Sequence, residues 1–131
     1  MDLNIRIIHH REFVMTAPSG AIDIEKSWQM LVKLASVTVP PNDYDILIDC
    51  REVTSQPTIS DITRLVGFMI DHRSSFRNKL AILTHPGTRL EVAKFAELYA
   101  QNRGLKVAAF DSFEAAIMWL STAIDMRSLD S

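Results

Sequence analysis

The hydrophobic and polar positions along the chain follow two different periods, which predict its secondary structure. LNIRII at 3–8 alternates apolar and polar residues, and YDILID at 44–49 is a short, mainly apolar run. Both patterns are typical of strands. Longer stretches repeat apolar residues every three or four positions, as one face of a helix does. In the first of these the repeated positions are Ile24, Trp28, Leu31, Val32 and Ala35. The pattern predicts strands at 3–8, 13–17, 44–49, 79–84 and 105–110, and helices at about 21–36, 58–70, 90–100 and 112–120.

The order of these elements, β-β-α-β-α-β-α-β-α, predicts one layered α/β domain. Strands that alternate with helices form a mainly parallel sheet through right-handed crossovers. Only the polar stretch HHRE at 9–12 separates the first two strands. This short separation predicts a hairpin, with one of the two strands as an antiparallel edge strand. We expect a five-stranded sheet in a single domain over 1–124, with a frayed polar tail at 125–131.

Composition and charge exclude several classes of protein. The chain has 131 residues, of which 47% are hydrophobic and 23% charged, so it is not disordered throughout. Its formal net charge of −2 and pI near 6.0 give no field to attract nucleic acid or an anionic membrane surface. Cys50 is the only cysteine, which excludes an intramolecular disulfide. Because the N-terminus lacks signal-peptide character and no apolar run could span a membrane, we expect a cytoplasmic protein.

The carboxyl ends of the predicted strands carry few reactive side chains, although α/β sheets place their functional loops there. Asp49 and Thr84 end two of the predicted strands, as the phospho-acceptor and switch hydroxyl of a response-regulator receiver would. A receiver also needs an acid pair after its first strand and a lysine after its last. Neither is present, since the last strand ends in Phe110 and Asp111. The expected functional loops are 50–57, 84–88 and 110–112.

Other catalytic and ligand-binding motifs are absent as well. Four glycines leave little material for a phosphate-cradling loop, and no nucleotide-binding motif occurs. Gln56, not arginine, stands where a tyrosine phosphatase would close its thiolate loop, so we expect Cys50 to be a packed small hydrophobe. His9 and His10 would point to opposite faces of a strand, and His85 is expected to be exposed in a loop. We predict no catalytic residues, no metal and no cofactor.

Thr58 allows two interpretations. The sequence TISD at 58–61 has the spacing of a capping box, in which the threonine oxygen and the Asp61 carboxylate each accept a backbone amide. TRLE at 88–91 and DSFE at 111–114 repeat this spacing at the next two helices. A phosphate on Thr58 would also lie at a helix N-terminus, where the macrodipole favours negative charge. The sequence leaves both interpretations open.

Three stretches carry a family resemblance: GAIDIEKSWQML at 20–31, DYDILIDCREVT at 43–54 and VAAFDSFEAAIMWL at 107–120. Over most of 1–120 the chain resembles the STAS superfamily, the domains shared by sulphate transporters and anti-sigma-factor antagonists. It is most similar to a small single-domain bacterial group that is also compared with CRAL-TRIO lipid-transfer domains. The resemblance implies a STAS-like fold and a non-enzymatic regulatory or protein-binding module.

The antagonists of this superfamily carry a phosphorylation switch at the helix after the central strand. There an acid and a phosphorylatable serine precede a glycine. Thr58 takes the serine position in this chain, while Pro57 replaces the acid and Ser60 the glycine. Thr58 is therefore the phosphorylation candidate, with Ser60 and Ser55 as weaker ones, and whether the switch works stays open.

The resemblance also implies a protein partner, kinase-like or sigma-regulatory in kind. The residues expected to contact it are Arg51, Glu52, Thr54, Thr58, Asp61 and His85. A homodimer stays open, with Phe68 or Trp119 as the residues that would mediate it.

The alternative function belongs to a different class. CRAL-TRIO domains carry lipids, so the alternative that the resemblance implies is a carrier of a lipid or small hydrophobic ligand. Such a carrier requires an apolar cavity inside the fold.

Overall fold

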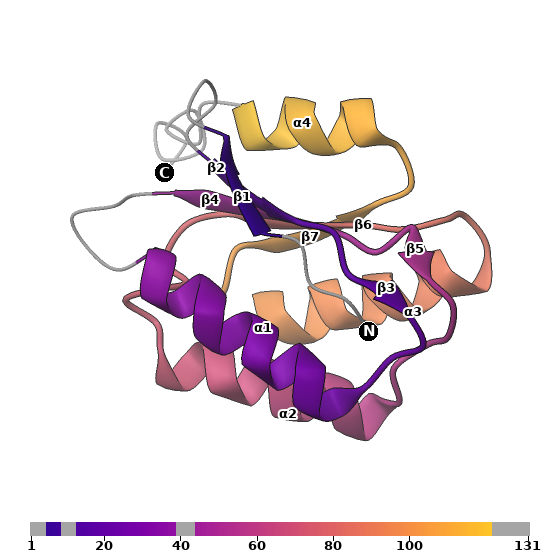
Figure 1. The fold of residues 1–131 in the computed structure, drawn as a ribbon, viewed down its shortest axis with the longest axis horizontal. Helices are drawn as coiled ribbons and strands as arrows, with labels where there is room; N and C mark the ends of the chain where they lie inside the picture. The colour runs from indigo at the N-terminus through magenta and orange to yellow at the C-terminus, as the bar shows by residue number, and fades with distance from the viewer. Residues whose placement is uncertain (1–4, 9–12, 39–43, 122–131) are drawn as a thin grey trace.

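The structure is a computed structural model that describes residues 5–8, 13–38 and 44–121. Three layers make up the fold, with helices α1, α2 and α3 on one face of a central sheet and α4 on the other (Figure 1). The predicted turn with His9 and His10 and the predicted tail at 125–131 lie outside the described residues. The helices are α1 (Ile24–Val37), α2 (Ile59–Asp71), α3 (Thr88–Gln101) and α4 (Phe113–Ser121).

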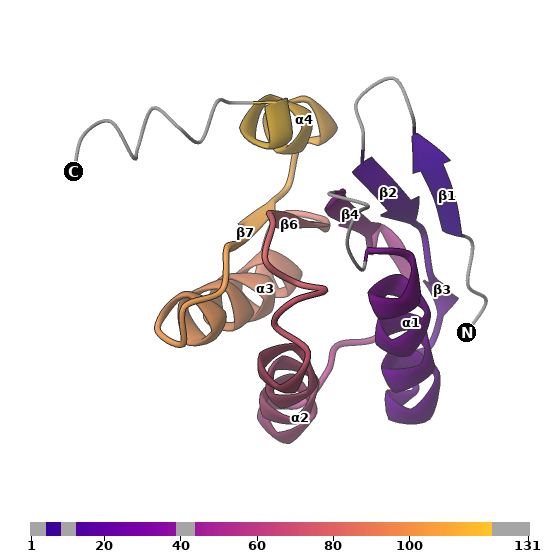
Figure 2. The same cartoon turned by 90° about the vertical axis from the view of Figure 1, so that its left-hand side faces the viewer.

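The central sheet confirms the predicted fold class. Its strands are β1 (Ile5–Ile8), β2 (Phe13–Thr16), β4 (Asp45–Asp49), β6 (Leu80–Leu83) and β7 (Val107–Phe110), which lie side by side in the order β1-β2-β4-β6-β7. β1 pairs antiparallel with β2, and the other neighbours pair in parallel (Figure 2). The sequence did not predict β3 (Ser19–Gly20) and β5 (Glu52–Val53), which form a separate two-stranded parallel sheet.

Alternation along the strands sends neighbouring side chains to opposite faces of the sheet. In β4, Ile46 and Ile48 belong to the core beneath α1, α2 and α3, whereas Leu47 packs in a second core with α4. We call these the cavity face and the α4 face. β6 repeats the arrangement, with Leu80 on the cavity face and Leu83 on the α4 face.

The buried side of α1 differs from the predicted stripe. Trp28 and Val32 are 37% and 47% exposed, and the buried positions include Ser27 and Leu34 instead. The Trp28 ring packs edge-on against Phe68 of α2, with 4.9 Å between ring centroids. A large side chain at the margin between two helices thus keeps an exposed edge, while the small Ser27 occupies the interior.

The ends of α3 and α4 correct two predicted capping boxes. Gly87, not Thr88, is the N-cap of α3, and no side chain caps that helix. At α4 the Ser112 hydroxyl, not the side chain of Asp111, accepts the amide of Ala115 at 3.3 Å. Helix α3 ends at Gln101, one residue beyond the predicted range of about 90–100, and Gly104 follows with a φ of 87°, which suits glycine.

Candidate functional site

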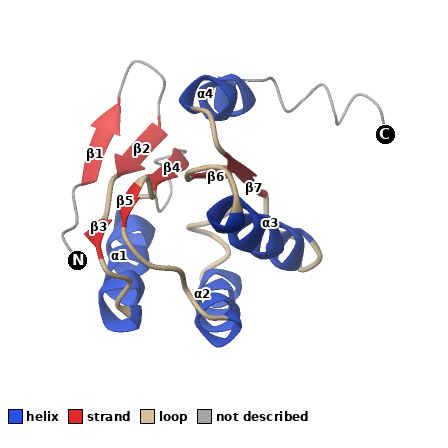
Figure 3. Ribbon diagram, turned by 90° about the vertical axis from the view of Figure 1, so that its right-hand side faces the viewer, coloured by secondary structure: helices blue, strands red, loops and turns tan. Residues whose placement is uncertain are grey.

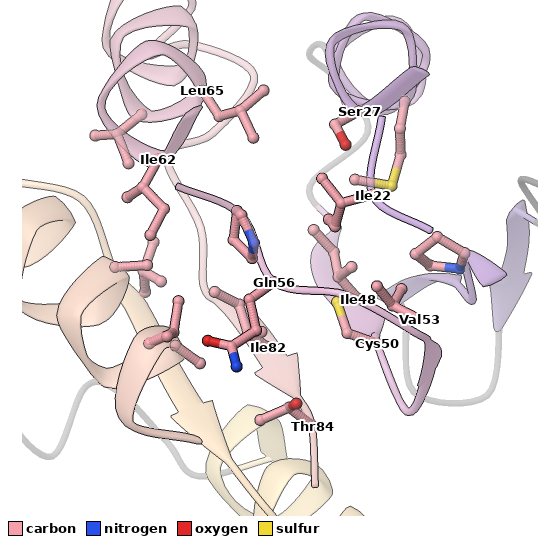
Figure 4. A pocket seen from close by; sticks show the side chains of 18 of the residues that line it. Ile22, Ser27, Ile48, Cys50, Val53, Gln56, Ile62, Leu65, Ile82 and Thr84 are labelled. Carbon is pink, nitrogen blue, oxygen red and sulfur yellow. The ribbon is translucent and has the colours of Figure 1, made fainter. Parts of the chain in front are cut away.

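An apolar cavity of about 170 Å³ lies between the cavity face of the sheet and helices α1, α2 and α3 (Figure 4). Ile48 and Ile82 line it from the sheet. Helix side chains that line it include Met30, Leu31, Ile62, Val66, Val92 and Ala96. Native cores pack with few voids larger than a water molecule, and an engineered apolar cavity of about 150 Å³ binds benzene. The space therefore suits a small hydrophobic molecule.

Small side chains on the helices leave this space open. Helix α3 presents Ala93, Ala96 and Ala100 to the cavity, and α1 contributes Ser27. Alanine and serine side chains have at most two heavy atoms, so they occupy little of the space that they line. The three alanines stand at helical spacing in the sequence, but this spacing does not show whether the space in front of them is filled.

One end of the cavity has a polar rim, formed by Ser55, Gln56, Thr84 and Arg89. Ser55 and Gln56 lie in the loop from β5 to α2 (Figure 3), Thr84 follows β6, and Arg89 lies in the first turn of α3. All four lie at the carboxyl edge of the parallel strands. Ser55 and Gln56 are exposed, so the cavity reaches the surface here.

Hydrogen bonds hold the loop at this rim in place. The Ile22 amide donates to the Ser55 hydroxyl at 2.7 Å, and the Thr54 amide donates to the Gly20 carbonyl at 2.9 Å. The Arg89 guanidinium donates to the Val53 carbonyl. These bonds hold the loop against the segment that precedes α1 and against Arg89 of α3.

Cys50 faces the cavity as a packed apolar group (Figure 4). Burial raises the pKa of its thiol to about 12, and the negative charge of Asp49 adds to this effect. Because the thiolate is the reactive form, the side chain is a poor nucleophile at neutral pH.

The α4 face carries a compact ionic cluster at the same carboxyl edge. The Arg51 guanidinium binds both carboxylate oxygens of Asp49, at 2.9 Å and 2.8 Å, and the Arg51 amide donates to the same carboxylate at 3.1 Å. His85 Nε2 lies 2.9 Å from the Arg51 carbonyl oxygen, and the guanidinium lies 5.8 Å from the centre of the Phe113 ring. The carboxylate is thus neutralised within its own loop.

The pKa of Asp49 reflects this cluster. Burial alone would raise it, but the hydrogen bonds and charge of Arg51, with a smaller contribution from His85, bring the pKa below its ordinary value. Asp49 therefore stays ionised in the folded protein at neutral pH.

Two groups among the predicted contact residues come together in the structure. Arg51 meets His85, and Thr58 forms the predicted capping box with Asp61, each donating a backbone amide to the other's side chain at 3.0 Å. Ser60, on the first turn of α2, is exposed like Thr58. Within the described residues, the exposed side chains of Glu52 and Thr54 form no hydrogen bond with the other candidates.

The two aromatic residues considered for self-association are packed inside the chain. Phe68 is buried between Trp28 and Phe76. Trp119 is partly buried, and its ring lies 5.6 Å from that of Phe110. Both rings therefore have aromatic packing partners within the chain.

The described residues also show two features that bear on other classes of function. No group of three histidine, cysteine, aspartate or glutamate side chains in ranges 5–8, 13–38 and 44–121 could hold a metal ion. None of the helices in these ranges is long and apolar enough to cross a bilayer.

Comparison with known proteins identifies the fold. Neither a protein-family profile nor a curated protein matches the sequence. Among solved structures, the chain is similar to an uncharacterised protein of the DUF3478 family with a SpoIIAA-like fold, from Shewanella loihica PV-4. The two are 17% identical with a TM-score of 0.59, and the match covers 91% of this chain and 92% of the other. The chain has the SpoIIAA-like fold, which is the STAS fold, and this confirms the resemblance at the level of fold.

Proposed function

We propose that this domain binds a small hydrophobic molecule in the cavity beneath α1, α2 and α3, without chemically changing it. The supporting observation is the apolar space of about 170 Å³ in a domain of only 131 residues. A carrier of a hydrophobic ligand requires an apolar cavity inside the fold, and this space is such a cavity. The thiol that lines the space is a poor nucleophile because its pKa is about 12, which supports binding rather than catalysis.

The size of the cavity limits the ligand and its affinity. A cavity near the size that accepts benzene takes an apolar group of about six carbons. At about 0.8 kcal/mol for each buried CH₂, this contributes about 5 kcal/mol, so a neutral ligand of that size binds no tighter than about 0.3 mM. Tighter binding requires a polar contact as well.

Titration with 1-hexanol tests the proposal. We expect saturable binding to the wild type in the high micromolar to millimolar range, followed by NMR shifts of backbone amides around the cavity. Ala96→Leu projects three more carbons into the space from α3 and should weaken this binding at least tenfold. Ala115→Leu is the matched control, because Ala115 is exposed on α4.

Two results would contradict this function. One is a wild-type protein with no saturable response to 1-hexanol. The other is equal binding by Ala96→Leu and the wild type while circular dichroism shows both folded.

A second proposed function is docking of a protein partner on the surface around the start of α2. The exposure of Glu52, Thr54, Thr58 and Ser60 supports it, and so does the SpoIIAA-like fold. In this proposal a phosphate on Thr58 would be repelled by the Asp61 carboxylate, which lies within the same capping box. The partner would then meet an altered loop and helix start.

Pull-downs from the native host test this docking surface. Thr58→Glu should reduce capture of a kinase-like or sigma-regulatory partner, whereas Ser36→Glu, which adds the same charge to an exposed position on α1, should not. If Thr58→Glu and Thr58→Ala both capture the same proteins as the wild type, this surface is not the docking site.

A further inference from the structure

The lining of the cavity changes in polarity from one end to the other. At the amino edge of the sheet it consists of apolar side chains, including Leu80, Val107, Met69 and Ala100. At the carboxyl edge it includes Gln56, Thr84 and Arg89. A molecule that fills the whole space would therefore meet hydrocarbon at one end and hydrogen-bonding groups at the other.

Arg89 is the charged residue of this rim, and only part of its guanidinium donates a hydrogen bond to the protein. It makes a hydrogen bond with the Val53 carbonyl and, within the described part of the chain, no ion pair. A guanidinium carries five N–H donors in a planar fork and no acceptor. Most of these donors face no protein acceptor, so they can serve a group that accepts hydrogen bonds.

Two further polar side chains lie at the same end. Within the described residues, neither the Gln56 amide nor the Thr84 hydroxyl makes a hydrogen bond, although Thr84 is only 5% exposed. Figure 4 shows both side chains at the end of the pocket where β6 finishes. Within the described part of the chain, Gln56 and Thr84 therefore offer polar groups without a protein partner at the same end of the cavity as Arg89, and a few convergent polar groups of this kind can orient a ligand in an otherwise apolar pocket.

We infer that the molecule bound in the cavity is an amphiphile whose carboxylate is held by Arg89, Gln56 and Thr84 and whose apolar tail extends toward Leu80 and Val107. This inference rests on the proposed small-molecule function and specifies the ligand class. A carboxylate matches the planar guanidinium through two parallel hydrogen bonds, which an alcohol cannot form. The hydrocarbon part fills the apolar end, where the cavity suits about six carbons.

A series of ligands with the same tail tests the head group in the wild-type protein. Hexanoate, 1-hexanol and hexylammonium are titrated separately, with acetate as a head group without a tail. We expect hexanoate to bind at least tenfold tighter than 1-hexanol, and hexylammonium and acetate to bind more weakly than 1-hexanol. This ranking needs no variant and so does not depend on the folding of one.

Substitution of Arg89 then assigns the preference to this residue. Arg89→Gln should lower hexanoate affinity at least tenfold more than it lowers 1-hexanol affinity, so that the preference for hexanoate is lost. Arg89→Lys, which keeps the charge but loses the planar fork, should fall between the wild type and Arg89→Gln. Arg64→Gln, at an exposed position of α2, is the matched control and should bind both ligands as the wild type does.

The outcomes separate this inference from the proposed function. If 1-hexanol and hexanoate bind equally well to the wild type, the cavity binds a hydrophobic molecule but the carboxylate inference is wrong. Acetate binding as tight as hexanoate, or tighter binding of hexylammonium, would overturn it too. If no member of the series binds, the proposed function fails along with it.

Discussion

Strand β4 directs Leu47 toward α4 and its neighbours Ile46 and Ile48 toward the other three helices, and the two faces are filled differently. On the α4 face Leu47, Leu83 and Ala116 are all fully buried, and one helix covers the sheet. On the cavity face three helices surround a space of about 170 Å³. The same alternation along one strand thus supports a filled core and a hollow one.

Small residues occur on both faces, but in different surroundings. On the α4 face, Ala116 of α4 and Ala81 of β6 are buried in one core with larger residues such as Leu47 and Leu83. On the cavity face, the alanines of α3 and Ile82 of β6 line the same open space. Small residues are thus part of a filled core on one face and of a cavity lining on the other.

The largest expected effect concerns two leucines that are equally buried on opposite faces. Leu47 is fully buried on the α4 face, and Leu31 is 3% exposed but lines the cavity. Truncation of a buried leucine costs about 2–5 kcal/mol. We expect Leu47→Ala to lie near the upper end and Leu31→Ala near the lower end, because Leu31 has fewer contacts to lose. Urea unfolding measures both, and equal or reversed losses would show that the two faces are filled alike.

The ionic cluster of the α4 face should make stability depend on pH. Asp49→Asn removes the charge that Arg51 binds and should lower the free energy of unfolding at pH 7 by about 1–2 kcal/mol. The folded pKa of Asp49 lies below its ordinary value of 3.8, so its contribution is complete above that value and is lost as pH falls through the folded pKa.

Unfolding of the wild type and Asp49→Asn between pH 2 and pH 7, sampled about every half unit, checks this sign. The difference between the two proteins should shrink at the acid end. Asp111→Asn, at an exposed position beyond β7, is the control and should leave the wild-type profile unchanged. A difference that stays constant across the range would mean that the Asp49 charge does not stabilise the fold.

The N-cap of α2, a helix on the cavity side of the sheet, should contribute less to the free energy of unfolding than the ionic cluster does. Thr58→Ala removes the hydroxyl that accepts the Asp61 amide and should cost about 1 kcal/mol, whereas Thr58→Ser should cost less because it keeps the hydroxyl. Thermal and urea unfolding of the two variants measure the effect. Equal losses for alanine and serine would show that the threonine methyl group, not the cap, is responsible.

The last prediction concerns the reactivity of Cys50 and no change in stability. Cys50 lines the cavity with a thiol pKa of about 12, so alkylation at pH 8 should be far slower in the folded protein than in urea. 1-Hexanol in the cavity should slow it further. Because Cys50 is the only cysteine, total labelling by mass spectrometry reports this site alone. Equal rates in the folded and unfolded protein would contradict its place in the cavity.

Periodicity predicted the order of elements and the sheet, because strand and helix patterns depend on local burial that the sequence displays directly. It also predicted the capping box of Thr58 and Asp61, whose partners are three residues apart. It misplaced the buried stripe of α1, because Trp28 packs sideways onto α2 and so keeps an exposed edge.

The cavity could not be predicted in this way. The pattern shows which side chains face inward but not whether they fill the volume between helices that are distant in sequence. The rim combines Gln56, Thr84 and Arg89 from three separate loops and helix starts, and no motif connects them. The alanines of α3 stand at helical spacing in the sequence, but only the structure shows that they line an open space.

An NMR titration of uniformly labelled protein with 1-hexanol tests most directly whether the cavity binds a hydrophobic molecule. We expect saturable shifts at residues around the cavity, such as Val66, Ile82 and Ala96, with little change at Leu47 and Ala116 on the α4 face. Shifts that spread equally over both faces, or none that saturate, would contradict the claim that one face of this sheet is built to hold a small hydrophobic molecule.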